Sequence, residues 1–221
     1  MEFQGPSATD YANVNALNRA FLALLRRDGT ARGCLRELRE PLRDKLVGLT
    51  GVQADRLAGA PFLLMSFRER DDRFWEQAFA DELRGDLFAV PPPAADDLVG
   101  LISAGLSFAW QLSKQNAYAA RLICGASLHW CEQLTELTFM HLLSIAGRRD
   151  EIVALRGAAD RDLWAKLLDS GTSREQQVRR AAHISALQSV LTQASLPAGR
   201  QWRTAACATR SPSLQIAEDD P

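Results

Sequence analysis

The chain has 221 residues and a formal net charge of −1, with 26 Lys and Arg against 27 Asp and Glu. This near balance argues against a protein whose main role is to coat nucleic acid or an anionic membrane. Hydrophobic residues make up 47% and charged residues 24%, which are ordinary values for a chain with a buried core and exclude wholesale disorder.

Helices are predicted through most of the first 90 residues. Apolar residues spaced three and four apart predict a helix over residues 11–27, which Gly29 ends. A second helix starts at about Pro41, because proline suits the first turn of a helix. Thr50 is the predicted N-cap of a third, short helix that Gly59 ends.

The following segments are more mixed. The apolar run at residues 62–67 fits either a strand or a buried helix. Charges of both signs at residues 68–73 are typical of a solvated helix start, and Asp71 or Asp72 is predicted to cap the helix that follows. Three consecutive prolines at residues 91–93 cannot continue a helix, so they mark a boundary.

Helical periodicity restarts at about Asp96 and dominates to about Gln193. Ser173 and Gln176 form a predicted capping box before the last helix. Beyond Leu196 the chain is rich in Pro, Gly, Ser and Thr and ends in acidic residues, a composition that predicts a disordered tail.

The order of these features occurs twice along the chain. A helix, a Leu-Thr pair, a glycine stop, an acidic cap and a tryptophan recur in register once single-residue gaps are allowed (21–27 with 108–114, 49–50 with 137–138, 57–59 with 145–147, and 71–75 with 160–164). A duplication would let two similar units bury a shared apolar face.

We therefore predict an all-α protein of two similar multi-helix units with a pseudo-two-fold relation. The expected divisions are a first unit at 1–90, a Pro-rich spacer at 91–95, a second unit with a C-terminal helix at 96–194, and a disordered tail at 195–221. The tryptophans in helical pattern are predicted to lie in the core (Trp75, Trp110, Trp130, Trp164).

The first half resembles the family of the flagellar transcriptional regulator FlhD. Four segments carry the resemblance, which covers residues 11–80 with a weaker echo over 101–169: Asn15–Asn18 leading into Phe21–Leu25, then Leu46–Thr50, Gln53–Ala58 and Phe62–Arg68. The resemblance implies an all-helical, dimerising protein that acts with a second, zinc-binding subunit at flagellar promoters and contributes little DNA binding alone.

By this resemblance the chain is a non-enzymatic regulatory protein of transcription, acting on motility or secretion genes through association with itself or a transcriptional subunit. DNA would be bound weakly or through the partner. A helical adaptor or chaperone of a secretion or motility apparatus, without DNA binding, stays open as the alternative.

No catalytic or metal-binding cluster can be named. His129, Cys124 and Cys131 come closest, but one helix presents these positions on different faces, which does not suit tetrahedral coordination. Phosphate-binding loops and nucleophile motifs are also missing from the sequence. We therefore expect no enzyme activity, no cofactor, no metal and no small-molecule ligand.

Two sets of residues are candidates for contacts with other molecules. Arginines near the start of the last helix could contact nucleic-acid phosphates (Arg174, Arg179, Arg180). Apolar residues of the first helix of each unit could form an association surface (Leu17, Phe21, Leu24, Leu25, Phe108, Leu112). Because neither a membrane-spanning stretch nor a signal peptide is visible, we expect a cytoplasmic protein without membrane association.

Overall fold

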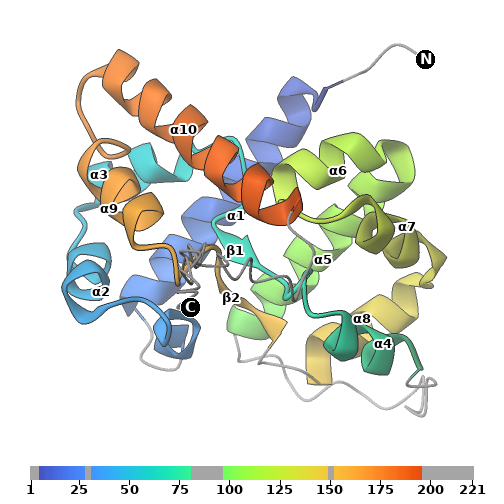
Figure 1. The fold of residues 1–221 in the computed structure, drawn as a ribbon. Coiled ribbons are helices and arrows are strands. Elements are labelled where there is room, and N and C mark those ends of the chain that lie inside the picture. Colours follow the sequence, from blue (N-terminus) through green and yellow to red (C-terminus); the bar gives the residue numbers. More distant parts are fainter. Residues whose placement is uncertain (1–4, 28–30, 81–96, 149–151, 196–221) are drawn as a thin grey trace, which may run out of the picture.

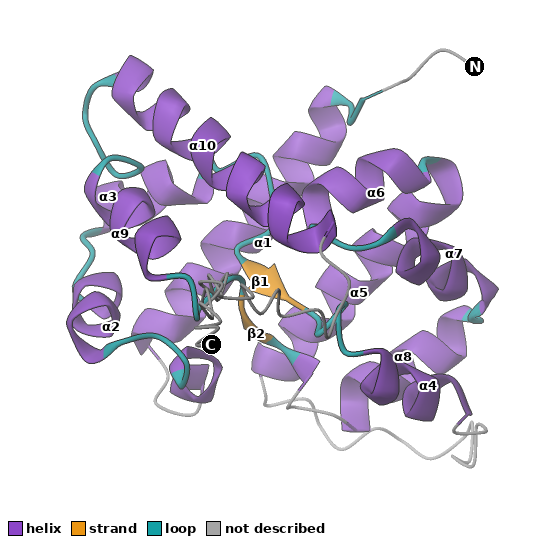
Figure 2. Cartoon of the chain, viewed as in Figure 1, coloured by secondary structure: helices purple, strands orange, loops and turns teal. Residues whose placement is uncertain are grey.

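The computed structural model describes residues 5–27, 31–80, 97–148 and 152–195 (Figure 1). This described part is built from helices and contains one two-stranded sheet (Figure 2). The expectation of an all-α protein is therefore confirmed. The predicted spacer at 91–95 and the predicted tail beyond Ser195 lie outside the described residues.

The described elements fall into two groups, one on each side of residues 81–96, and we call these groups the first and the second half of the chain. The first half contains α1 (Ala8–Arg27), the 3-10 helix η1 (Ala31–Leu35), α2 (Glu40–Val47), α3 (Gly51–Ala58), β1 (Met65–Ser66) and α4 (Asp72–Ala80). The second half contains α5 (Asp97–Gln115), α6 (Ala117–Cys124), α7 (Leu128–Glu136), α8 (Phe139–Arg148), β2 (Ala154–Leu155), α9 (Arg161–Asp169) and α10 (Gln176–Ser195).

Local capping chemistry explains where several helices begin. Thr50 and Gln53 form a complete capping box before α3, as predicted for Thr50. Asp71 accepts a hydrogen bond from Phe74 N at 3.1 Å ahead of α4, and Asp160 caps α9 in the same manner. The helix starts predicted at Thr50 and Asp71 are confirmed.

Two other helix starts differ from the prediction. Helix α1 begins at Ala8, because Ser7 and Asp10 cap it reciprocally, with Ser7 N donating to Asp10 Oδ2 at 2.7 Å and Asp10 N to Ser7 Oγ at 3.2 Å. The capping box predicted for Ser173 and Gln176 does not form. Helix α10 starts at Gln176, and Ser173 Oγ accepts from Glu175 N instead.

The sheet joins the two halves. Strands β1 and β2 pair antiparallel, with Met65 opposite Leu155 and Ser66 opposite Ala154. The apolar run at 62–67, which the sequence left open between strand and helix, forms no helix and contains a two-residue strand at Met65–Ser66 next to bends at Phe62 and Leu64.

One continuous hydrophobic core runs through both halves. Helices α1 and α5 pack against each other at its centre, α3 packs on α1, and α6, α7 and α8 surround α5 (Figure 1). Trp75, Trp130 and Trp164 are buried as predicted, whereas Trp110 is only half-buried. The units predicted at 1–90 and 96–194 thus share a single core.

Helix α10 spans the two halves on one side of the molecule (Figure 1). It approaches the end of α6 so closely that a Cβ on Gly125 would lie 2.5 Å from Val190 Cγ1. The backbone at Gly125 is left-handed, with φ at 58°, so glycine suits the position for two reasons. From the first half, Arg70 Nη2 donates to Val190 O at 3.0 Å.

Within the described ranges no helix is both long enough and apolar enough to cross a membrane.

Candidate functional site

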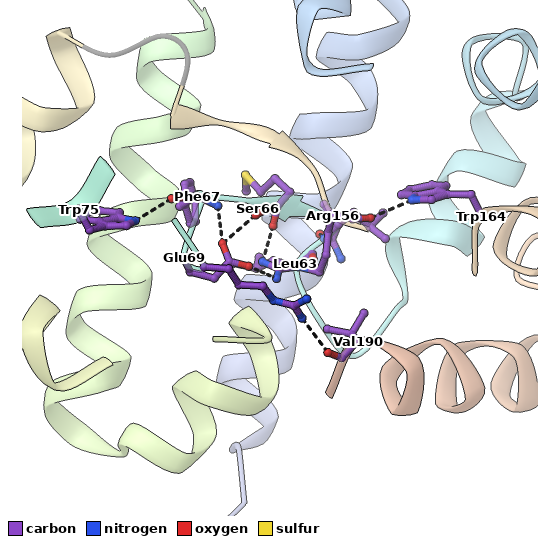
Figure 3. A network of polar contacts seen from close by, with 12 residues as sticks. Leu63, Ser66, Phe67, Glu69, Trp75, Arg156, Trp164 and Val190 are labelled. Atoms are coloured by element: carbon purple, nitrogen blue, oxygen red, sulfur yellow. Dashed lines mark hydrogen bonds and ion pairs between the residues drawn. The ribbon is translucent and has the colours of Figure 1, made fainter. Parts of the chain in front are cut away.

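A buried polar network lies where β1 and β2 meet (Figure 3). Its central group is Arg156, which follows β2 and has a side chain only 4% exposed. The guanidinium Nε donates to Leu63 O at 2.6 Å, Nη2 donates to Met65 O at 2.7 Å, and Nη1 pairs with Glu69. Every one of these partners belongs to the first half of the chain, so this arginine binds across the junction.

Glu69, from the first half of the chain, supplies the carboxylate that pairs with Arg156. Its side chain is 3% exposed, and its Oε2 accepts hydrogen bonds from Ser66 Oγ and Phe67 N, both at 2.8 Å. The two buried charges are therefore paired, and each also has hydrogen bonds to neutral groups. Breaking such a pair by removing one partner costs about 3–5 kcal/mol, because the other charge stays buried without compensation.

The sequence prediction for residues 68–73 was wrong at Glu69. The mixed charges suggested a solvated helix start, but the carboxylate turns inward to meet Arg156. The neighbouring Arg68 adopts a left-handed backbone with φ at 53°, and its guanidinium pairs with Asp71. This tight turn reverses the chain between β1 and α4 and directs the next side chain toward the interior.

Two tryptophans hold the outer ends of the network, on opposite sides in Figure 3. Trp75 Nε1 donates to Phe67 O at 3.1 Å, and Trp164 Nε1 donates to Arg156 O at 2.8 Å. Each indole thus bonds to the carbonyl eight residues before it, one on each side of the paired strands. The matching bonds fix both strand-to-helix turns.

A groove of about 1020 Å³ opens beside this network. It is bordered by the turns that follow the two strands and by Val190 and Gln193 of α10. Its described lining includes four arginines and five carboxylates, several of which already serve the fold. Asp160, for example, caps α9 and also accepts from Gln193 Nε2 at 2.7 Å. Burial lowers the pKa of the Arg70 guanidinium, the group that bonds to Val190 O.

The three candidate arginines for nucleic-acid contact differ in their surroundings. Arg174 and Arg180 are exposed. Arg179 is half-buried, and its Nη1 donates to Ser173 O at 2.9 Å, where it closes the turn before α10. Arg174 and Arg180 are therefore the two candidates on the surface, whereas Arg179 serves the fold.

The predicted association surface needs correction. Phe21, Leu24, Leu25 and Leu112 are at most 3% exposed and belong to the core. The two remaining candidates, Leu17 and Phe108, are partly buried against that core. These residues pack helix against helix inside the chain and do not present a surface to another molecule.

Exposed apolar side chains lie elsewhere, with one group at the start of α8. Phe139 and Met140 are each 47% exposed, and the Phe139 ring lies 5.9 Å from the Trp110 ring between centroids. Lys114 Nζ lies 4.0 Å from the centroid of the Trp110 ring, a cation–π contact. We call Trp110, Phe139 and Met140 the α8 patch.

The described cysteines and histidines are not grouped into a metal site. Cys124 and Cys131 are free and buried, and burial raises the pKa of the Cys131 thiol to about 11. Both thiols are thus protonated at neutral pH, because the pKa of Cys124 is raised still further by burial. His129 is exposed. In the described ranges no three His, Cys, Asp or Glu side chains are grouped so as to hold a metal.

Sequence reasoning missed Glu69 and Arg156, the central pair of the network. The only signal was an isolated arginine within the apolar and small residues at 152–159. Comparison with known proteins identified no relative: no family model, no curated protein and no solved structure matches the chain.

Proposed function

We propose that this chain is a non-enzymatic regulatory protein of FlhD type, which acts through helix-mediated protein association in the transcriptional regulation of motility or secretion genes. The observation that carries the proposal is the reciprocal pairing of β1 with β2 between two halves of similar element order. We further propose that this pairing represents an internal, pseudo-two-fold dimer of two FlhD-like units.

The register of the two strands supports this organisation. When the halves are aligned on Trp75 and Trp164, Met65 corresponds to Ala154 and Ser66 to Leu155. In the sheet each residue pairs with the counterpart of its neighbour, as the two strands of a symmetric dimer interface do. The matching indole bonds to Phe67 O and Arg156 O agree with the same alignment.

An internal pair of this kind changes which surfaces a partner can use. The helices that would mediate dimerisation in a single-unit protein are packed together in the core. A transcriptional subunit would have to bind outside that core, and the α8 patch offers exposed apolar and aromatic area for this purpose. The sequence alignment of the two halves contains single-residue gaps, and in the segment that pairs 49–50 with 137–138 the counterpart of Met140 is Val52. Val52 is 60% exposed.

Affinity purification from the source organism tests the proposal. The tagged chain should recover a component of the transcription machinery, identified by mass spectrometry. The double substitution Phe139→Asp with Met140→Asp should abolish that recovery, because it places charge in an apolar contact while acidic residues suit the first turn of α8. Val52→Asp is the matched control on α3 and should leave recovery unchanged.

Recovery without any transcription component would contradict the proposal. So would equal recovery by the wild-type chain and the α8-patch variant, because the partner would then bind elsewhere.

The second candidate is a helical adaptor or chaperone that binds no DNA. It is favoured by the structural use of Arg179, which leaves Arg174 and Arg180 as the exposed members of the candidate nucleic-acid set. Duplex binding distinguishes the two candidates. A regulator, alone or with its captured partner, should gain affinity for promoter DNA as salt is lowered, whereas an adaptor should stay at background.

A further inference from the structure

The central ion pair breaks the similarity between the two halves. In the proposed alignment Glu69 corresponds to Ala158, and Arg156 corresponds to Phe67. Each half therefore supplies one charge that the other half lacks at the equivalent position. Both charges are almost fully buried, and both lie at the junction between the halves.

A second contact at the same junction is apolar, and it too involves residues that differ between the two halves. The ring of Phe67 from the first half lies against Gly105 of α5, so closely that a Cβ on Gly105 would be 2.5 Å from Phe67 Cζ. In the segment that pairs 21–27 with 108–114, the counterpart of Gly105 is Asn18. Asn18 is fully buried. Its amide makes three hydrogen bonds inside its own half, donating to Ala58 O and Phe62 O and accepting from Leu64 N.

We propose that the Glu69–Arg156 pair and the Phe67–Gly105 contact form a pairing lock, which selects association of a first half with a second half and rejects association of like halves from two chains. This inference rests on the two-unit organisation in the proposed function. It assigns the buried ion pair to specificity of association, a use for which buried polar groups are known.

The consequences of mismatched pairing follow from the residues that would meet. Two first halves would bury Glu69 opposite Phe67, without a guanidinium, and would press Phe67 against the Asn18 side chain. Two second halves would bury Arg156 opposite Ala158, without a carboxylate, and would place the Arg156 side chain, the counterpart of Phe67, beside Gly105. A buried unpaired charge is strongly destabilising, so both mismatched arrangements are excluded.

The binding partner is therefore not a second copy joined through this junction. In a related single-unit protein the junction would be the dimer interface, but here it is closed within one chain. Any partner of this protein must recognise a surface outside the lock.

Complementation between two variants of the 221-residue chain tests the lock. Glu69→Ala leaves Arg156 unpaired, and Arg156→Phe leaves Glu69 unpaired. Each variant alone should lower the ratio of folded to unfolded protein by at least about a hundredfold. When the two variants are refolded together, exchange of halves can rebuild one native ion pair and one wholly apolar junction. The mixture should form a 1:1 dimer of higher thermal stability than either variant, seen by native mass spectrometry and circular dichroism.

Two further samples keep the test decisive. The double variant Glu69→Ala with Arg156→Phe contains no unpaired buried charge and loses only hydrogen bonds to neutral groups, so it should fold as a single chain and be more stable than either single variant. Asn18→Ala removes a comparable number of buried hydrogen bonds within one half, so mixing it with Arg156→Phe should give no 1:1 dimer.

The proposal is overturned if the first mixture contains no 1:1 species, if the Asn18→Ala mixture forms it equally well, or if the double variant is as unstable as the single ones. Purified protein suffices for all of these measurements. Their outcome is thus distinct from failure of the transcriptional proposal, which depends on what the chain recovers from the cell.

Discussion

The indole of Trp75 in α4 packs edge-to-face against the indole of Trp130 in α7, with 5.4 Å between ring centroids and 77° between ring planes. The first ring belongs to the first half of the chain and the second ring to the second half. Trp75 Nε1 also bonds to Phe67 O, whereas Trp130 Nε1 is buried without a hydrogen-bond partner. The two indoles are in contact, but only the ring nitrogen of Trp75 makes a hydrogen bond.

This difference predicts unequal effects of tryptophan removal. Trp75→Phe and Trp164→Phe each leave a buried carbonyl without its donor, which costs about 1–3 kcal/mol in addition to the lost ring volume. Trp130→Phe removes an unpartnered donor and should be clearly less destabilising. Urea unfolding followed by far-UV circular dichroism measures the three free energies. Equal losses for Trp75→Phe and Trp130→Phe would show that the indole bond to Phe67 O contributes nothing.

Replacing either glycine of α5 by alanine should change the stability of the protein, with opposite signs at the two positions. Gly105→Ala forces a Cβ against the Phe67 ring and should destabilise the protein by about 1–3 kcal/mol through overpacking. Gly100 lies on the same helix with open space around it, so Gly100→Ala should stabilise by about 0.5–1 kcal/mol through helix propensity. Thermal unfolding of both variants beside wild type checks the signs, and a stable Gly105→Ala variant would contradict the close contact described for Phe67.

His183 predicts a loss of stability at acid pH. Burial lowers its pKa below the ordinary 6.5, and the nearby charge of Arg179 lowers it further. Because the folded state binds the proton less readily than the unfolded state, the stabilisation is fully present above about pH 6.5 and is lost as the pH falls through and below that value. One such proton gives a slope of at most about 1.4 kcal/mol per pH unit.

The pH dependence is isolated by replacing the histidine. The difference in urea midpoint between pH 8 and pH 5 should shrink in His183→Gln, because the titrating group is gone. The same substitution at the exposed His129 should leave the wild-type pH dependence in place. An unchanged pH dependence in His183→Gln would assign the effect to other groups.

The buried thiols predict slow modification of the folded protein. Cys124 and Cys131 are buried with raised pKa values, so a thiol reagent at pH 8 meets few thiolates and little access there. In a Cys34→Ser, Cys207→Ser background, the folded chain should react at least about a hundred times more slowly than the chain in denaturant. Fast reaction of both thiols under native conditions would mean that α6 and α7 open readily.

Much of the helical framework could be predicted because its signals are local. The Thr50 cap of α3, the Asp71 cap of α4 and the Gly59 stop depend on residues within one turn of each helix. The start of α1 was missed by three residues, because the Ser7–Asp10 caps precede the periodic apolar residues. Capping chemistry outside an apolar pattern carries a weaker signal than the pattern itself.

The candidate site could not be predicted in the same way. An apolar stripe has the same spacing whether it faces a second molecule or a second half of the same chain, so Phe21 and Leu112 were assigned to a surface that the fold buries. Glu69 stands in a run of mixed charges that is ordinarily solvated. Its partner, Arg156, lies 87 residues away in the sequence. The residues around either one give no sign that the two side chains pair.

The sequence by itself determined the helical character of the fold and several of its helix caps, because hydrophobic periodicity and capping act over a few residues. Only the tertiary structure decided that the two halves close on each other and that Glu69 is buried against Arg156. The physical reason is that a buried charge is tolerated only when a distant part of the chain brings its counter-charge to it.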